Sequence, residues 1–433
     1  MPCAAGVEGF LADEVHAITG LTGHDLMTGR GGVMARASWR DAMRINLYSR
    51  LTQRVLVQLS VTDYRNENDL YRAASEVAWE IWFTPKPTFK IDITAQHSPL
   101  TSLNFAALKI KDAVADRFRA KRGERPSVDT SWPDVRIYAH LTPEPLTLYI
   151  DTSGEPLFKR GWRTDKGDAP LKETLAAAMI AASGWDRTVP LYDPCCGSGT
   201  LPIEAAQIAC GIAPGLQRRF GFEKLLHFQN HVWQGLVEEA RNQEHEPTAP
   251  IFGSDVAFRM VDFAERNAER AGVSGVIEFR GGDALQRMPP SETPGVMLLN
   301  PPYGERIAAA GVAGRGRENF QPGALADARS SARAADQSHH RETAQTQDGD
   351  DSVDFFAQLA SHWKKNYSGW SAWMLTPDLK LPSKMRLKES RRVPMWNGPI
   401  ECRLFRFDMV KGSLKRNAPP GADTPGAEET PAP

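Results

Sequence analysis

The chain has 433 residues, 41% of them hydrophobic and 24% charged, which is enough for two or three domains with cores of their own. Its formal net charge is −1, so a nucleic-acid partner would have to meet a local basic surface instead of the field of the whole molecule. No run approaches the ~18 consecutive apolar residues of a membrane span, and no charged–apolar–small leader opens the chain. We therefore expect a cytoplasmic protein with no membrane partner.

The five cysteines indicate neither a metal site nor a disulfide framework. They contain no C-x-x-C pair and have no partner His at zinc spacing, so we expect no metal. An odd number of scattered thiols also suits a reducing compartment. The cysteines are Cys3, Cys195, Cys196, Cys210 and Cys402.

Residues 2–60 predict a small α/β unit. Apolar spacing predicts helices over Val7–Ile18 and Ala42–Leu51, and strands over Gly31–Ala35 and Arg54–Leu59. Because the chain enters its first helix almost at once, a β-α-β unit would lack its first strand. We expect the natural chain to begin slightly upstream.

Residues 71–151 predict a second α/β unit. Strands are expected at Phe89–Ile93, Val135–Ala139 and Leu146–Ile150, where apolar and polar residues alternate. The intervening Phe105–Arg119 carries apolar residues at steps of three and four, which predicts a helix.

A basic segment runs through that helix and past its end, from Lys109 to Arg125. It holds seven basic residues against three acids. A solvated helix face would explain such a surplus, and a phosphate-binding edge is the sharper alternative. The basic residues are Lys109, Lys111, Arg117, Arg119, Lys121, Arg122 and Arg125.

A glycine loop between a strand and a helix is the first sign of a cofactor site. The short strand Val189–Asp193 leads into the loop Pro194–Thr200, and a helix is expected over Leu201–Ala209. We expect Gly197 and Gly199 to let the backbone approach a nucleotide-like ligand at the helix N-terminus. The third glycine of the dinucleotide fingerprint is absent, so a purely structural turn is the alternative.

Three acids follow predicted strands in series. Asp193 ends one strand, Asp255 ends the strand Ile251–Asp255, and Asp283 follows the strand Val276–Arg280. A carboxylate at such a strand end can hold the two hydroxyls of a ribose, and a neighbouring acid can accept from an adenine amine. The dinucleotide spacing of ~20 residues fails here because a helical stretch, Asn230–Asn242, intervenes, so only the order of elements supports this interpretation.

The turn Asn300-Pro301-Pro302-Tyr303 leaves the apolar run Val296–Leu299. Each proline fixes its own φ and disfavours the α region for the residue before it, so the turn is held extended. The Asn300 amide and a nearby carbonyl would then be adjacent acceptors for an exocyclic –NH2, with Tyr303 available to stack on the ring. A proline-rich turn that only closes a strand is the alternative.

Residues 308–352 contain almost no large apolar residues, so we interpret them as a disordered insertion, for which a passive linker is favoured over RNA contact. A helix over Phe355–Asn366 and strands at Ser371–Leu375, Arg391–Pro394 and Cys402–Val410 are expected beyond it. Residues 412–433 predict a loose tail.

Taken together, the chain resembles the bacterial 23S rRNA guanine-N2 methyltransferases of the L type over residues 2 to about 411. The resemblance rests on Leu171–Ala178, Asp193–Ala205, Asn300–Arg306 and, for an RNA-binding THUMP helix, Phe105–Ala113. It implies an N-terminal ferredoxin-like/THUMP α+β module followed by a Rossmann-like class I methyltransferase domain with a seven-stranded, mostly parallel sheet. The implied parts are 1–60 (ferredoxin-like), 61–155 (THUMP), 156–411 (methyltransferase, with insertion 308–352) and 412–433 (tail).

The resemblance also implies S-adenosylmethionine as cofactor and 23S rRNA, free or in a pre-ribosomal large-subunit particle, as partner. Asn300, Pro301, Pro302 and Tyr303 would form the catalytic turn. Some family members continue into a second methyltransferase domain, and we expect any second modification not to belong to this chain. The residues implied to line the cofactor are Asp193, Cys195, Gly197, Ser198, Gly199, Thr200, Asp255, Asp283 and Asn300.

Other functions stay open on the residues alone. The turn at Asn300 would serve any planar –NH2, so an adenine-N6, cytosine-N4, tRNA guanine-N2 or glutamine-amide methyltransferase is an alternative within enzymes. A non-catalytic RNA-binding assembly factor is the alternative from another class, and the intact glycine loop and acids argue against it.

Overall fold

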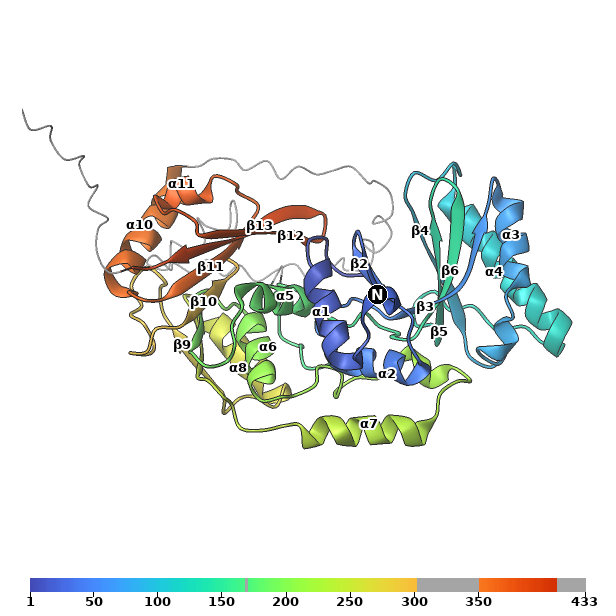
Figure 1. Cartoon of the computed structure of the whole chain (residues 1–433), viewed down its shortest axis with the longest axis horizontal. Helices are drawn as coiled ribbons and strands as arrows, with labels where there is room; N and C mark the ends of the chain where they lie inside the picture. The colour runs from blue at the N-terminus through green and yellow to red at the C-terminus, as the bar shows by residue number, and fades with distance from the viewer. Residues whose placement is uncertain (168–169, 302–349, 411–433) are drawn as a thin grey trace, which may run out of the picture.

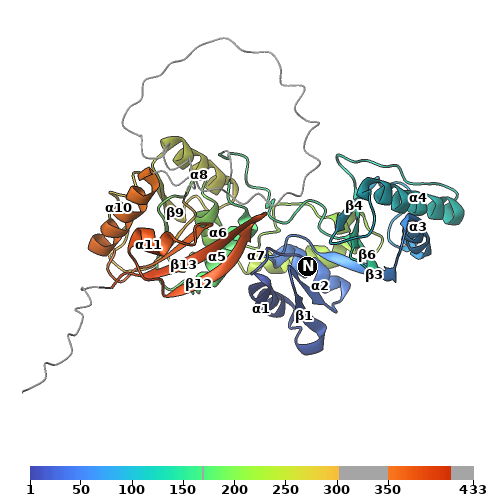
Figure 2. The same cartoon turned by 90° about the horizontal axis from the view of Figure 1, so that it is seen from above.

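The computed structural model describes residues 1–167, 170–301 and 350–410. Three parts lie in a row: a seven-stranded sheet with its helices, a small N-terminal module beside it, and a four-stranded module at the far end (Figures 1 and 2). Residues 308–349 of the predicted insertion 308–352, the predicted tail 412–433, Pro302 and Tyr303 lie outside these residues. The last three residues of the predicted insertion, 350–352, instead belong to helix α10 (Asp350–Asn366), so the insertion was predicted too long at this end.

The N-terminal module has two helices and a hairpin. Its predicted helix at Ala42 begins earlier, at Trp39, because Ser38 and Asp41 form a capping box at its N-terminus. The missing first strand is reduced to one bridge, in which Pro2 pairs with Gly32. Its elements are α1 (Glu8–Thr19), η1 (Gly23–Asp25), β1 (Leu26–Gly29), β2 (Gly32–Ala35) and α2 (Trp39–Tyr48).

The four-stranded module is a sheet in the order β3-β6-β5-β4, where only β4 and β5 are parallel. Helices α3 and α4 pack together beside this sheet (Figure 1). The sequence analysis missed α3, which begins with an Asn66–Asp69 capping box. The elements are β3 (Leu56–Asp63), α3 (Glu67–Glu76), η2 (Trp79–Ile81), β4 (Phe89–Ala95), α4 (Leu103–Arg122), β5 (Val135–Leu141) and β6 (Pro145–Asp151).

The large sheet has the strand order β12-β13-β11-β10-β7-β8-β9. The strands from β11 to β9 are parallel to one another, and β13 is antiparallel to both of its neighbours. The strands are β7 (Leu191–Asp193), β8 (Ile251–Asp255), β9 (Ile277–Gly281), β10 (Val296–Leu299), β11 (Ser371–Thr376), β12 (Arg391–Asn397) and β13 (Ile400–Asp408).

Helices cover both faces of this sheet. Because side chains alternate along a strand, Leu298 packs on the side of α5 and α6, whereas Met297 and Leu299 pack with α10 and α11. Helix α10 begins five residues before the predicted Phe355, since a helix can extend beyond its last apolar residue. The helices are α5 (Glu173–Ser183), α6 (Thr200–Ala209), η3 (Gly221–Lys224), α7 (Asn230–Asn242), α8 (Phe258–Arg270), α10 (Asp350–Asn366) and α11 (Leu381–Met385).

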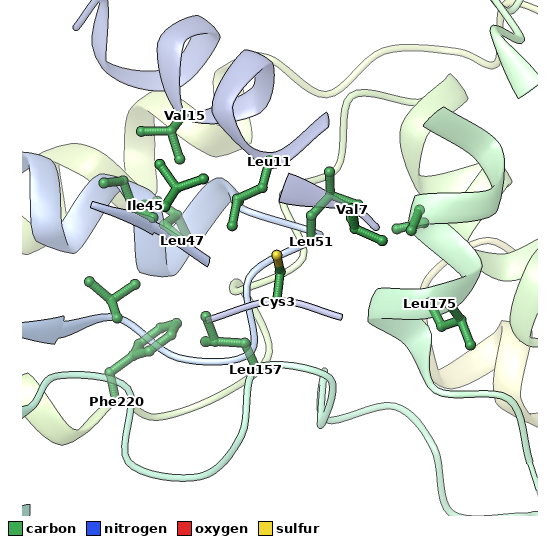
Figure 3. Packing of buried hydrophobic residues seen from close by; sticks show 14 of the residues in the cluster. Cys3, Val7, Leu11, Val15, Ile45, Leu47, Leu51, Leu157, Leu175 and Phe220 are labelled. Atoms are coloured by element: carbon green, nitrogen blue, oxygen red, sulfur yellow. The ribbon is translucent and has the colours of Figure 1, made fainter. Parts of the chain in front are cut away.

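One apolar core joins the N-terminal module to the large domain. Leu175 of α5 belongs to the same buried cluster as α1 and α2, together with residues from the loops before α5 and after α6 (Figure 3). The labelled members are Cys3, Val7, Leu11, Val15, Ile45, Leu47, Leu51, Leu157, Leu175 and Phe220.

Candidate active site

The residues predicted from the strand ends lie together at the carboxyl end of the parallel strands in the large sheet. Strand β7 lies between β8 and β10, and all three are parallel, so their carboxyl ends meet. Asp193 and Asp255 are the last residues of β7 and β8, Asp283 follows β9, and Asn300 follows β10. Open α/β sheets bind ligands at the carboxyl ends of their strands, at the point where successive strands are added on opposite sides of the first strand. Here that first strand is β7.

The acids hold the glycine loop through backbone hydrogen bonds. The Asp193 carboxylate accepts from the Cys195 N–H at 3.0 Å, and the Asp255 carboxylate accepts from the Gly197 N–H at 2.9 Å. The Cys196 N–H donates to the Ser254 carbonyl at 2.9 Å. Each carboxylate oxygen can accept more than one bond, so both acids keep acceptor capacity for a ligand.

The acidic residues at this end of the sheet are buried or half-buried. Burial, and then the charge of Asp255, raise the pKa of the Asp193 carboxyl well above its usual range. Burial raises the pKa of Asp255 as well, and two backbone hydrogen bonds oppose that shift. The pKa of the Cys195 thiol is raised well above its usual range by burial and by three acids, Asp283 among them. Cys195 is therefore a neutral lining group and no nucleophile.

The two glycines of the loop have different reasons to be glycine. Both have positive φ, 52° at Gly197 and 88° at Gly199. A Cβ at Gly197 would meet nothing within 4 Å, whereas a Cβ at Gly199 would lie 2.9 Å from the Ala264 Cβ of α8. Gly197 thus borders open space beside the acids. The missing side chain of Gly199 lets α6 pack against α8, and its predicted role in the approach of a ligand stays a prediction.

One buried and one partly buried side chain, neither of them predicted, support the loop. Asn267 of α8, fully buried, donates to the Ser198 carbonyl at 3.0 Å. Arg163 donates to the Thr200 hydroxyl at 2.6 Å and pairs with Glu173 at 2.8 Å. For Arg163, the available signal was the pair of arginines in Arg160–Arg163 shortly before the apolar run Leu171–Ala178.

The structure describes the predicted catalytic turn as far as Pro301. Asn300 is half-buried and Pro301 is buried. Asn300 stands at the end of a strand whose four residues are all buried, so it marks the point where the chain leaves the core. Pro302 and Tyr303 remain predictions, because they lie outside the described residues.

The basic segment lies on α4 and directly after it, at the opposite end of the molecule from the large sheet (Figure 1). Arg117 is engaged within the module, since its guanidinium donates to both oxygens of Glu80, at 3.0 and 2.7 Å. Arg119 pairs with the adjacent Asp116, and the Lys109 ammonium lies over the Phe105 ring. Lys111 pairs with Asp112, and Arg122 donates to the Glu80 carbonyl. Lys121 and Arg125 are exposed.

Neither a metal cluster nor a membrane span is found within the ranges that the structure describes. No group of three or more His, Cys, Asp or Glu side chains there could hold a metal ion. No helix in the same ranges is long and apolar enough to cross a membrane.

In the large sheet the antiparallel strand β13 lies between β11 and the outermost strand β12. This strand order and the acid-bound glycine loop define a class I methyltransferase fold. The chain matches the family described as "RMKL-like, methyltransferase domain" over residues 160–326, the THUMP domain over 64–151 and the RlmL ferredoxin-like domain over 1–56. It therefore carries an RMKL-like methyltransferase domain preceded by a THUMP domain and an RlmL ferredoxin-like domain, which confirms the predicted domains and fold class.

Relatives agree with this assignment. The chain is 36% identical to the ribosomal RNA large subunit methyltransferase K/L of Psychromonas ingrahamii over 93% of this chain and 49% of that protein. It thus spans about half the length of the curated relatives it matches. Among solved structures, SMU.472 in complex with SAH has a TM-score of 0.77 at 26% identity, covering 95% of this chain and 98% of that one. A predicted N6-adenine-specific DNA methylase from Listeria monocytogenes has a TM-score of 0.75 at 26% identity, covering 94% of each.

Proposed function

We propose that this chain is an S-adenosylmethionine-dependent RNA methyltransferase that transfers a methyl group to the 2-amino group of a guanine in 23S rRNA. The observation that carries the proposal is the meeting of the acid-bound glycine loop after β7 with Asn300 after β10. The curated relatives' name, which specifies ribosomal RNA of the large subunit, supports the choice of substrate.

The residues at this edge suit S-adenosylmethionine. The open space at Gly197 admits a ligand against the loop backbone, and the Asp255 and Asp283 carboxylates are acceptors for ribose hydroxyls and for an adenine amine. The Asp255 and Asp283 carboxylates also favour a sulfonium cation over a neutral ligand. When bound, this cofactor supplies an activated methyl group.

The turn after β10 would orient the nucleophile. The guanine amine is weak because its lone pair is delocalised into the ring. Acceptors at the Asn300 amide and the Pro301 carbonyl would take its N–H bonds, direct the lone pair, and stabilise the positive charge that develops on nitrogen. No strong general base is needed, because the proton becomes acidic only after transfer. Tyr303 would cover a base that has left its stack, with Pro302 holding the turn.

The THUMP part would dock RNA, and the cytoplasm would be the place of action. Lys121 and Arg125, exposed at the end of α4, are the members of the basic segment best placed to meet phosphates. The substrate would be free 23S rRNA or a pre-ribosomal large-subunit particle.

Nucleoside mass spectrometry of ribosomal RNA from cells with and without the protein tests this proposal. A loss of N2-methylguanosine from 23S rRNA supports it. A loss of N6-methyladenosine from rRNA would favour an adenine-N6 RNA methyltransferase, and a change confined to tRNA would favour a tRNA guanine-N2 enzyme. Unchanged rRNA together with no cofactor binding in a calorimetric titration would leave a non-catalytic RNA-binding factor.

A further inference from the structure

A cleft of about 490 Å³ lies at the junction between the THUMP part and the methyltransferase domain. It is lined by the linker that joins β6 to α5 and by Arg218 and Arg219 of the loop after α6. None of the predicted site residues lines it. The cleft adjoins the catalytic domain through Arg163, one of its lining residues, which donates to the Thr200 hydroxyl at the start of α6.

The lining of this cleft is strongly cationic. It contains seven Lys or Arg side chains and only two acidic ones, Glu155 and Glu173. Four of the cations are neutralised by carboxylates at or near the cleft. These pairs are Lys159 with Glu155, Arg160 with Glu204, Arg163 with Glu173 and Arg219 with Glu223.

The other three cations, Lys166, Lys172 and Arg218, form no ion pair with the described part of the chain. Lys166 and Lys172 are exposed, and the Lys172 ammonium lies over the Phe158 ring at 5.3 Å from its centroid. A ring face leaves an ammonium free to bind an anion on its other side.

Arg218 adds a third positive charge to the lining of the cleft. Its two terminal nitrogens donate to four backbone carbonyls, those of Ser153, Glu155, Pro156 and Lys159. Carbonyl oxygens satisfy its hydrogen bonds without cancelling its charge. Burial and the neighbouring Arg160 lower the pKa of Arg218 to about 10, so it stays charged near neutral pH. The potential in the cleft is therefore positive even where Arg218 makes no direct contact.

We propose that this cleft binds the phosphodiester backbone of the RNA substrate, with the Lys166 and Lys172 ammonium groups contacting phosphates. The inference rests on the proposed RNA methyltransferase function and locates a second anchoring point for the same substrate. The linker comes directly from the THUMP sheet and ends at α5, so a strand held here lies between the THUMP part and the domain that carries Asn300. The volume suits a nucleotide-sized ligand, and apolar Phe158, Pro170 and Leu171 add a surface for ribose or base.

The test compares RNA binding of the full chain with that of the double variant Lys166→Gln/Lys172→Gln. Affinity for a single-stranded 30-nucleotide RNA of mixed sequence is measured at several salt concentrations. Loss of two phosphate contacts should reduce the slope of log K against log[salt] by about 1.4, and Lys166→Arg/Lys172→Arg should keep the wild-type slope. The matched control Lys365→Gln/Lys388→Gln removes two exposed lysines from α10 and from the segment after α11, at the other end of the molecule, and should leave the slope unchanged.

Cofactor affinity, measured by calorimetry on the same variants, separates the outcomes. An unchanged slope in the Gln variant of the cleft overturns the proposal. So does a weakened affinity for S-adenosylmethionine with RNA binding intact, which would assign the cleft to the cofactor. If the slope falls in the Gln variant of the cleft but the wild-type protein methylates no rRNA, the proposed function fails while the cleft assignment stands.

Discussion

Replacing each glycine of the cofactor loop by alanine separates ligand approach from packing. Gly197→Ala adds a methyl group at φ 52° with nothing within 4 Å, so its cost to folding is only the left-handed conformation, about 1–2 kcal/mol. Gly199→Ala pays a similar conformational cost at φ 88°. Its methyl group also meets the Ala264 Cβ at 2.9 Å and the Ile203 Cδ1 at 3.2 Å, which adds about 1–3 kcal/mol of overpacking. The expected totals are about 1–2 kcal/mol for Gly197→Ala and about 2–5 kcal/mol for Gly199→Ala.

Affinity for the cofactor should rank the variants in the reverse order, with the larger loss in Gly197→Ala. The new methyl group at position 197 occupies the open space beside Asp255, so affinity for S-adenosylmethionine should fall by at least about tenfold, or ~1.4 kcal/mol. Folded Gly199→Ala should lose less. Urea unfolding gives the stabilities, and calorimetry well below the unfolding midpoint gives the affinities. Equal destabilisation by the two substitutions, or unchanged affinity in Gly197→Ala, would refute the assignment of the two roles.

Three further outcomes are expected. Asn300→Ala should slow single-turnover methylation of undermodified rRNA by about 100- to 1000-fold, or ~2.7–4 kcal/mol, with a much smaller effect on cofactor affinity; a near wild-type rate would exclude its role as acceptor. Glu204→Ala leaves Arg160 buried without its carboxylate and should cost about 3–5 kcal/mol in urea unfolding, against at most ~1 kcal/mol for the exposed control Glu401→Ala. The pKa of buried Asp151 is raised by burial to about 6 from 3.8, so the folded state binds its proton more tightly and this stabilisation is lost as the pH rises through 6. Between pH 4 and 7 the wild type should therefore lose up to about 3 kcal/mol of unfolding free energy relative to Asp151→Asn, and parallel pH curves would contradict this.

The elements of the large domain could be predicted well because strand, turn and helix alternate with clear apolar runs. The bounds Asn230–Asn242 and Ile251–Asp255 agree with the structure at both ends, and the four strand-end residues were expected to lie together. Helix α3 was missed because its amphipathic face is short, with buried Leu70, Ala73 and Ala74 as its only fully buried residues. Such a helix depends on its cap and on packing against α4, and neither is visible in the spacing of apolar residues.

The finer features of the site could not be read from the chain. Gly197 and Gly199 look equivalent in sequence, and only the approach of α8 distinguishes them. The basic segment on α4 was expected to act as a whole. In the structure Glu80 binds Arg117 from a different element, a pairing between positions far apart in the chain that spacing does not reveal. The cleft cations are likewise gathered from segments about 50 residues apart, Lys166 and Arg218 among them.

The core shared by α1, α2 and α5 makes the N-terminal module part of the catalytic body. Because Val7 and Leu11 are buried in the same cluster as Leu175, that module cannot turn independently of the domain that carries the acids. Ile137 and Leu148 of the four-stranded module belong to the same cluster, so the span between that module and Asn300 is also nearly constant. On the proposed function, such an enzyme would select among exposed guanines by their distance from the part of the RNA that is docked on the four-stranded module. It would therefore leave a guanine in the correct sequence unmethylated if that guanine lay at the wrong distance, and the fold of the RNA would contribute to specificity.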